Sequence, residues 1–567
     1  MSRPSPAPLE VSASCASRPS SDLWRMLGFS LCLLVVCGAS ETVGRALAHP
    51  HASFVRAASV RTQSSRKLPS PEKIVGDYVK AIGGKKKLAS LRDATYVWAV
   101  GRSGGEAGTA RTQSKSPASL RTDIHFDGGE IDMAANSRSA WMRDADGRLR
   151  TLTDSEAFAA RLQAQLEASR MLDYKKRNVL ARTVALEQLR GEPAFIVEFS
   201  TRSGARLRYW FGTTSRLLLQ VTDDARGLTL RFADWRAAGS DASLLEPHRV
   251  ELERRGMEVL TLALQEARYN TGLDDSVFEP PGDAGLDIPA LLRELARNQD
   301  DVDRRINDYT FLRKVTERKL NDRGEVTKET ATVHEVYPVV GWGWVMKLVS
   351  ENGTPLTPER AAKEEKRVAE ELAKAEREAP KLEEKRQRKR AERAAKSKAD
   401  GADAVDDEDD IGINTFLRAC EFVSPRRERF RERDTIVFDF RARPGFRPST
   451  RGESIASKLV GVVWVDPADQ QVVRLEARLA EGFKMGGGLV ASIKPGSAFV
   501  FEQTRLPDGL WLPRFSQVNA SARLFLFAGM SINQTHEFSD YKRFSTKSGD
   551  ATLDAPKERD AKTPPPR

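Results

Sequence analysis

Cysteine is scarce in this chain. Four cysteines occur among 567 residues, and Cys15, Cys32 and Cys37 all stand near the N-terminus, which leaves Cys420 alone in the remainder. If an N-terminal leader is removed, the single remaining thiol can form no intrachain disulfide, and one thiol cannot build a zinc site by itself. Because apolar neighbours surround Cys420, we predict a small buried side chain rather than a catalytic nucleophile.

Histidines are also few, and the familiar catalytic motifs are missing. None of the six histidines has a convincing partner at a metal-binding or catalytic spacing: His49, His51, His125, His248, His334 and His536. The HExxH, CxxC, GxSxG and phosphate-binding Walker patterns do not occur. We therefore expect no catalytic residue, no metal ion and no cofactor, and we predict that the protein is not an enzyme.

Long apolar runs are absent too. The longest, at 26–36, is too short to span a bilayer but is typical of a signal peptide. We predict a signal peptide and leader at 1–48, a disordered linker at 49–69, and export to the periplasm or outer membrane of a Gram-negative-type bacterium. Residues 34–37 resemble a lipobox, so a lipid anchor at Cys37 is the alternative.

Acidic residues do not balance basic ones. The formal net charge is +11, but the Lys and Arg residues are spread along the chain without a nucleic-acid-binding motif. We therefore expect no nucleic-acid partner. Anionic head groups at a membrane surface are a better match for this charge, and a merely soluble basic surface is the alternative.

The order of predicted elements indicates two domains. An amphipathic helix begins at Pro71 and ends at Gly83-Gly84. Strand patterns follow it to about 270, interrupted by a second helix at 154–172 that also has an apolar stripe. A further amphipathic helix at 288–306 and a strand at 309–320 restart the same order. We predict a first domain at 70–283, a second at 284–546 and a disordered tail at 547–567.

A charged insertion interrupts the second domain at 357–411. It is rich in Glu, Lys, Arg and Ala, and oppositely charged residues three or four apart favour an isolated, solvent-exposed helix. Pro380 is expected to break or kink this helix. The alternative is an arm that binds an envelope protein or a membrane surface.

A group of four strand motifs appears twice in the chain. Aromatic strand residues, a reversal, a second apolar strand and a step containing proline recur in the same order, which predicts two copies of one antiparallel sheet. The first copy occupies 207–211, 216–219, 228–235 and 246–250, and the second occupies 462–466, 473–475, 499–503 and 512–515.

Strand alternation places apolar side chains on one face of each predicted sheet. A curved sheet that its helices fill incompletely would leave a cavity suited to an acyl chain, whereas a fully packed core is the alternative. The candidate ligand-binding residues on these faces are Leu207, Tyr209, Phe211, Leu228, Leu230, Phe232, Val473, Leu475, Phe499 and Phe501.

The motifs also resemble a known family. The helix ending at Gly83-Gly84, Tyr209-Trp-Phe, the Phe-Ala-Asp-Trp of 232–235 and the segment 274–280 are similar to the outer-membrane lipoprotein-sorting (LolA/LolB/RseB-like) superfamily. Further, more divergent matches lie at 464–466, 473–475, 512–513 and 538–541. The resemblance covers roughly 71–544 without the insertion. It implies half-barrels that bind lipid or lipoprotein acyl chains in the periplasm, without catalysis or metal.

These observations give one fold and two functional hypotheses. We expect an α+β protein with two tandem antiparallel half-barrel sheets, each covered by a few helices, and a charged helical insertion in the second. The leading hypothesis is an exported, non-catalytic protein that binds a lipid, an acyl chain or a lipoprotein in the cell envelope. The alternative is a non-transporting protein–protein interaction or envelope-sensing module that acts through the insertion.

Overall fold

The computed structural model describes residues 68–102, 105–127, 129–238, 241–283, 285–321, 325–399, 413–485, 491–524 and 528–543. The predicted leader, all but the last two residues of the predicted linker, and the predicted tail lie outside these ranges. Among the described residues, no helix combines the length and the apolar character needed to cross a membrane.

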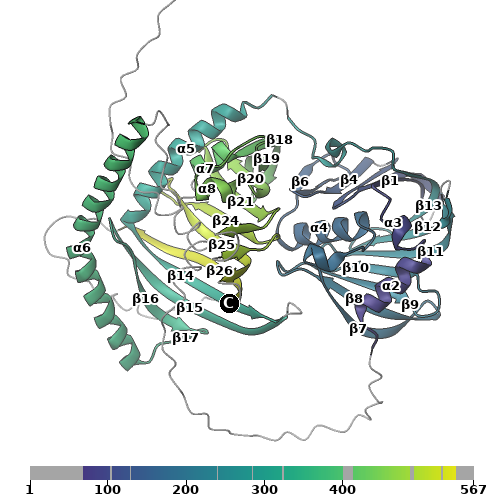
Figure 1. Cartoon of the computed structure of the whole chain (residues 1–567), viewed down its shortest axis with the longest axis horizontal. Helices are drawn as coiled ribbons and strands as arrows, with labels where there is room; N and C mark the ends of the chain where they lie inside the picture. The colour runs from purple at the N-terminus through teal and green to yellow at the C-terminus, as the bar shows by residue number, and fades with distance from the viewer. Residues whose placement is uncertain are drawn as a thin grey trace, which may run out of the picture.

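Two large antiparallel sheets lie beside each other, each with a few helices, which confirms the predicted fold class (Figure 1). The elements of the first domain are α2 (Pro71–Ala81), α3 (Lys85–Leu88), β1 (Asp93–Arg102), β2 (Gly105–Lys115), β3 (Ser119–Phe126), β4 (Gly129–Ala135), β5 (Ala140–Arg143), β6 (Leu149–Thr151), α4 (Asp154–Ala168), η2 (Tyr174–Arg177), β7 (Leu180–Leu189), β8 (Glu192–Ser200), β9 (Arg206–Gly212), β10 (Leu218–Asp223), β11 (Leu228–Ala238), β12 (Asp241–Arg254), β13 (Leu260–Tyr269) and η3 (Asp275–Phe278).

The second domain repeats the order of helix and then strands. Its elements are α5 (Ile288–Arg305), η4 (Ile306–Asp308), β14 (Tyr309–Leu320), β15 (Val326–Val339), β16 (Gly343–Glu351), β17 (Thr354–Pro355), α6 (Pro358–Ala399), α7 (Ile413–Ala419), β18 (Cys420–Phe430), β19 (Arg433–Ala442), α8 (Arg451–Ala456), β20 (Leu459–Asp466), β21 (Gln471–Leu479), β22 (Phe483–Met485), β23 (Ala491–Ile493), β24 (Ala498–Arg505), β25 (Trp511–Leu524) and β26 (Ala528–Arg543).

Both sheets have the same strand topology. In each, the first strand pairs with the last, so β1 lies beside β13 and β14 lies beside β26. The strands then run in the order β12-β11-β10-β9-β8-β7 in the first sheet and β25-β24-β21-β20-β19-β18 in the second. The motifs predicted as equivalent fall on equivalent strands, since β9 to β12 correspond to β20, β21, β24 and β25.

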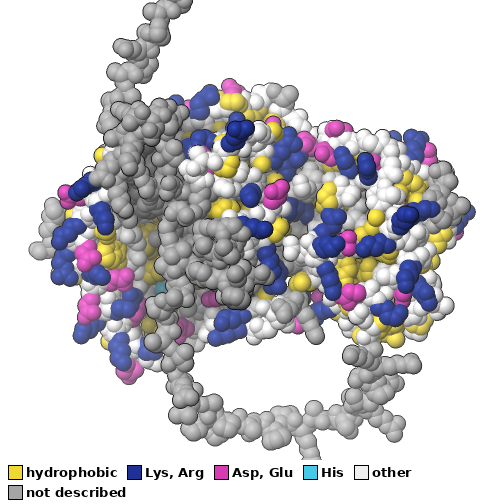
Figure 2. Space-filling model, viewed as in Figure 1, with side chains coloured by type: hydrophobic (Ala, Val, Ile, Leu, Met, Phe, Trp, Pro, Cys, Tyr) yellow, Lys and Arg dark blue, Asp and Glu magenta, His cyan; other side chains and the backbone are white. Residues whose placement is uncertain are grey.

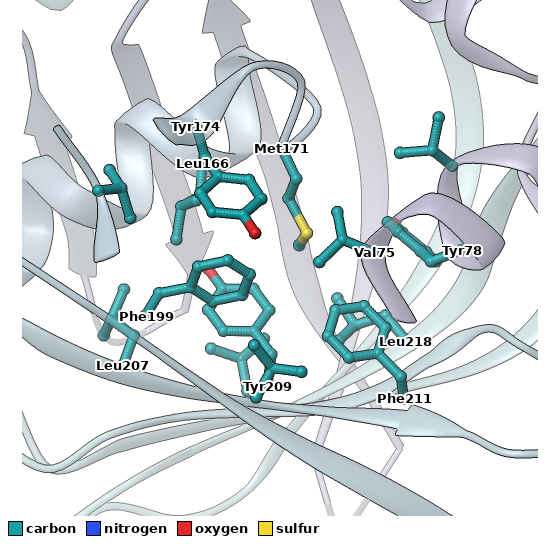
Figure 3. Packing of buried hydrophobic residues seen from close by; sticks show 14 of the residues in the cluster. Val75, Tyr78, Leu166, Met171, Tyr174, Phe199, Leu207, Tyr209, Phe211 and Leu218 are labelled. Atoms are coloured by element: carbon teal, nitrogen blue, oxygen red, sulfur yellow. The ribbon is translucent and has the colours of Figure 1, made fainter. Parts of the chain in front are cut away.

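The first core lies where α2 and α4 cover the sheet (Figure 3). Ser70 caps α2 by accepting a hydrogen bond from the backbone N–H of Lys73, and Pro71 occupies the first turn. Val75 and Tyr78 point from α2 toward β9, while Leu166 of α4 closes the cluster from the other side. These contacts use the apolar stripes that the sequence predicts for both helices.

The predicted insertion forms α6, which lies along the outer side of the second sheet (Figure 1). Val368 and Ala375 of α6 are buried against Val345 of β16, so the helix is not purely solvent-exposed as expected. The helix also continues through Pro380, so the expected break is wrong.

The helix α6 also covers the open edge of β16. The Glu364 carboxylate accepts a hydrogen bond from the backbone N–H of Leu348 at 2.8 Å, and Arg367 donates to the Met346 carbonyl. Beyond its short pairing with β17, this part of β16 would otherwise present unpaired backbone groups, which attract a strand of another molecule. The helix α6 lies in the connection between β17 and β18. The equivalent connection of the first domain runs from β6 to β7 and contains α4.

Buried polar contacts hold the two domains together. The backbone N–H and the hydroxyl of Thr151 donate to Glu428 at 2.7 and 2.6 Å, and the Ser139 hydroxyl donates to Asp439 at 2.6 Å. Arg426 lies between these two carboxylates, 2.8 Å from Glu428 and 3.0 Å from Asp439. Because the buried charges of this network are paired, it fixes the position of one domain against the other.

Candidate functional site

The predicted apolar residues of the first sheet lie in packed clusters. Leu207, Tyr209 and Phe211 are at most 1% exposed and fill the space under α2 and α4 (Figure 3). Leu230 and Phe232 are half-buried beside the same cluster, and Leu228 packs on the neighbouring cluster of β1 and β12. Strand parity therefore predicts the shared face, and around β9 this face is occupied by the protein's own side chains.

In the second sheet, one of the four predicted residues lies on the opposite face. Leu475 and Phe501 share the core that α5, α7 and α8 cover, and Phe499 packs at its margin, whereas Val473 packs with Trp464. The pairing of β20 with β21 shifts at Val473. A bulge inserts one residue and reverses the alternation beyond it, so the placement of Val473 beside Leu475 was wrong.

A cavity of about 820 Å³ lies between the two domains. The helix α4 and the segment from η2 into β7 supply one wall, and β20, β21 and the start of β24 supply the other. This volume lies within the usual range of ligand pockets. Of the ten predicted residues, Phe499 lines the cavity. The apolar lining includes Phe158, Leu162, Val179, Val460, Phe499 and Ile532.

Basic side chains outnumber acidic ones around this cavity. Figure 2 shows Lys and Arg side chains on both sides of the junction between the domains. Two carboxylates line the cavity, and both are engaged: Glu72 pairs with Lys175, and Glu476 pairs with Arg474 at 2.6 Å. Within the part of the chain that the structure describes, the lining cations that form no ion pair are Arg161, Arg177, Arg202, Arg478 and Lys494.

Two of these cations, one from each domain, act on each other. Burial lowers the pKa of Arg161 on α4. Burial, with the like charge of Arg161 added, lowers the pKa of Arg478 on β21 to about 10. Arg478 donates one hydrogen bond across the junction to the Ser137 carbonyl, and Arg161 lies over the Phe158 ring at 5.5 Å. Neither contact supplies a negative charge.

Arg177 completes this group of cations. Its Nε atom is buried, and no hydrogen-bond acceptor lies within reach among the described residues. A buried donor without a partner is unfavourable unless water or a ligand satisfies it. The cavity therefore offers unsatisfied positive groups directly beside apolar side chains.

Two of the singly placed histidines, His334 and His536, lie near Arg313, away from the cavity. The Arg313 guanidinium donates to Nδ1 of His536 at 3.0 Å, and burial lowers the pKa of His536 to about 3. Burial, with the Arg313 charge added, also lowers the pKa of His334. Both imidazoles are therefore neutral near pH 7, and this contact was not visible in the sequence.

Other reactive groups are sparse in the described ranges. Cys420 is fully buried, as its neighbours predicted, and burial raises the pKa of its thiol to about 12. The same ranges hold no group of three or more His, Cys, Asp or Glu side chains arranged for a metal ion. The interdomain cavity is therefore the best-defined candidate site.

No family model and no curated protein matches the chain. Several solved structures match part or most of the chain. A LolA superfamily protein from Nitrosomonas europaea has 13% identity, a TM-score of 0.26, and covers 38% of this chain and 99% of its own. Mycobacterium tuberculosis lipoprotein LppX has 12% identity, a TM-score of 0.15, and coverages of 36% and 99%.

A longer match is the MucA/MucB complex of Pseudomonas aeruginosa, with 8% identity, a TM-score of 0.17, and coverages of 82% of this chain and 94% of that one. The matched proteins include members of the superfamily that the sequence motifs resemble. At these TM-scores no function passes to this chain, so its own residues carry the proposals below.

Proposed function

We propose that this protein is an exported, non-catalytic binding protein for a lipid, acyl chain or lipoprotein in the cell envelope. The observation that supports this function is the interdomain cavity of about 820 Å³, in which apolar side chains lie beside cations that pair with no carboxylate in the described ranges. An acyl chain would contact Phe158, Leu162 and Val460, and a polar end group would contact the cations. The apolar run at 26–36 supports export.

The predicted apolar faces have different places in this proposal. Phe499 would contact the ligand directly because it lines the cavity. Leu207, Tyr209 and Phe211 would instead fix the shape of the first domain, since they are buried under its helices. A second ligand position on the first sheet would require those helices to move.

The insertion packs on the second sheet, which argues against the alternative hypothesis that it is a partner-binding arm. Its apolar residues Val368, Leu372 and Ala375 already pack on β15 and β16. Its Glu364 and Arg367 bind the backbone of the β16 edge. A protein partner would therefore meet only the charged outer surface of α6, where pairing contributes little.

Native mass spectrometry tests the proposal directly. The protein is purified from the envelope of its own organism, and its mass is compared before and after mild activation. We expect a bound amphiphile that activation releases, and uptake of fatty acid or phospholipid by delipidated protein. A ligand-free mass together with no uptake would overturn the proposed function.

A further inference from the structure

Charge pairing distinguishes the cavity from the rest of the domain junction. Arg426 and Arg474 are each 1% exposed, and each lies against two or more carboxylates. Arg161 and Arg478 line the cavity at the same junction and form no ion pair among the described residues, although the charges of Glu476 and Asp439 act on Arg161 from a longer distance. Both side chains are half-buried, so the absence of an ion pair disfavours their charges, although less than it would for a fully buried guanidinium. The cavity wall therefore carries more positive than negative charge.

This excess of positive charge lies beside apolar surface. The Arg161 guanidinium stacks over Phe158, and Leu162 follows on the same helix and also lines the cavity. Arg177, with its unpartnered Nε, stands next to Val179 in the same wall. An oxyanion on an alkyl chain would satisfy the cations and cover the apolar side chains together.

We propose that the cavity is an oxyanion clamp, in which Arg161 of the first domain and Arg478 of the second bind the carboxylate or phosphate group of an amphiphile. This inference rests on the proposed function and adds the charge of the ligand to it. The planar guanidinium fits both oxyanions through paired N–H donors. The alkyl chain lies along Phe158 and Leu162.

The clamp also explains how a ligand would act on the whole protein. Arg161 and Arg478 belong to different domains, and their like charges repel each other. An oxyanion between them turns this repulsion into two attractions across the junction. Ligand binding should therefore stabilise the arrangement of the two domains as well as fill the cavity.

Calorimetric titration of the full mature chain tests the clamp with four probes. Decyl phosphate, decanoate and neutral decyl glucoside share one chain length, and inorganic phosphate carries no chain. We expect both anionic amphiphiles to bind at least about tenfold more tightly than decyl glucoside, since charge-assisted hydrogen bonds differ from neutral ones by this order. The comparison of phosphate with carboxylate identifies the preferred head group.

Variants assign the effect to the two arginines. Arg161→Gln and Arg478→Gln should each weaken decyl phosphate about tenfold or more and leave decyl glucoside unchanged. Arg478→Lys keeps the charge but loses the paired donors, so its loss should be smaller. Arg297→Gln, on the exposed side of α5, is the matched control and should bind like the unchanged protein. Circular dichroism checks that each variant is folded.

The outcomes separate the two proposals. Equal binding of anionic and neutral amphiphiles would overturn the clamp and leave the proposed function standing. Binding of inorganic phosphate as tightly as decyl phosphate would overturn the amphiphile as ligand. Binding of no probe with an alkyl chain would overturn the proposed function itself.

Discussion

Two arginines on one strand provide the sharpest test of the charge distribution. Arg474 and Arg478 lie on the same face of β21, and both stand at the domain junction. Arg474 contacts Glu476, Glu502 and Asp154, whereas among the described residues Arg478 has a hydrogen bond to the Ser137 carbonyl and no ion pair. We compare Arg474→Met with Arg478→Met in the ligand-free protein, because methionine keeps much of the length of arginine and removes its charge.

The two substitutions should differ by about 3 kcal/mol. Arg474→Met leaves the buried Glu476 carboxylate without its ion-pair partner, and breaking a buried pair in this way costs about 3 to 5 kcal/mol. For Arg478, a pKa of about 10 means that the fold disfavours its charge by roughly 3 kcal/mol. Because the side chain keeps contact with water, which screens this charge, we reduce the unfavourable free energy to about 1 kcal/mol. The lost hydrogen bond to Ser137 costs about 1 kcal/mol, so the net change for Arg478→Met is near zero.

Urea unfolding followed by tryptophan fluorescence measures both effects. The midpoint should fall clearly for Arg474→Met and stay within error for Arg478→Met. Arg441→Met, which removes a half-exposed pair between Arg441 of β19 and Glu421 of β18, is the control and should change the free energy of unfolding by less than about 1 kcal/mol. If Arg478→Met destabilises the protein as much as Arg474→Met, Arg478 is a structural member of the junction and the reasoning about an unpaired charge is refuted.

Three further predictions concern the second domain. His536 has a pKa near 3 in the folded protein, so below about pH 6.5 the unfolded chain binds a proton that the folded chain does not. The free energy of unfolding should therefore fall by about 2 kcal/mol between pH 6.5 and 5, as measured by urea titrations at several pH values. His536→Gln keeps a hydrogen-bond acceptor for Arg313 and should flatten this pH dependence. Glu364→Ala should speed hydrogen exchange at the Leu348 amide and promote self-association in ultracentrifugation, and unchanged exchange would show that α6 does not protect this edge. Pro380→Ala should restore a helical hydrogen bond at an exposed site and slow hydrogen exchange in α6, and no change would mean that the helix already tolerates proline without strain.

Much of the fold could be predicted from the sequence because local patterns specify it. The strand at 309–320 matches β14 at both ends, and the helix predicted at 288–306 matches α5 within one residue. The repeated motifs lie on topologically equivalent strands because alternation, turns and helix caps are local signals. Val473 was misplaced because a bulge depends on the partner strand β20, which alternation in β21 alone does not reveal.

The candidate site could not be predicted in the same way, and β21 shows why. Arg474, Glu476 and Arg478 are two residues apart and therefore share one face of the strand. The sequence thus places one carboxylate between two guanidinium groups, and it does not show which of them forms the ion pair. Tertiary contacts decide: Glu502 of β24 and Asp154 of the first domain gather around Arg474, and Glu476 joins them. Arg478 is left facing Arg161. The shortage of negative charge at the cavity is therefore a consequence of how the two domains dock. A ligand that supplies this charge must contact arginines of both domains.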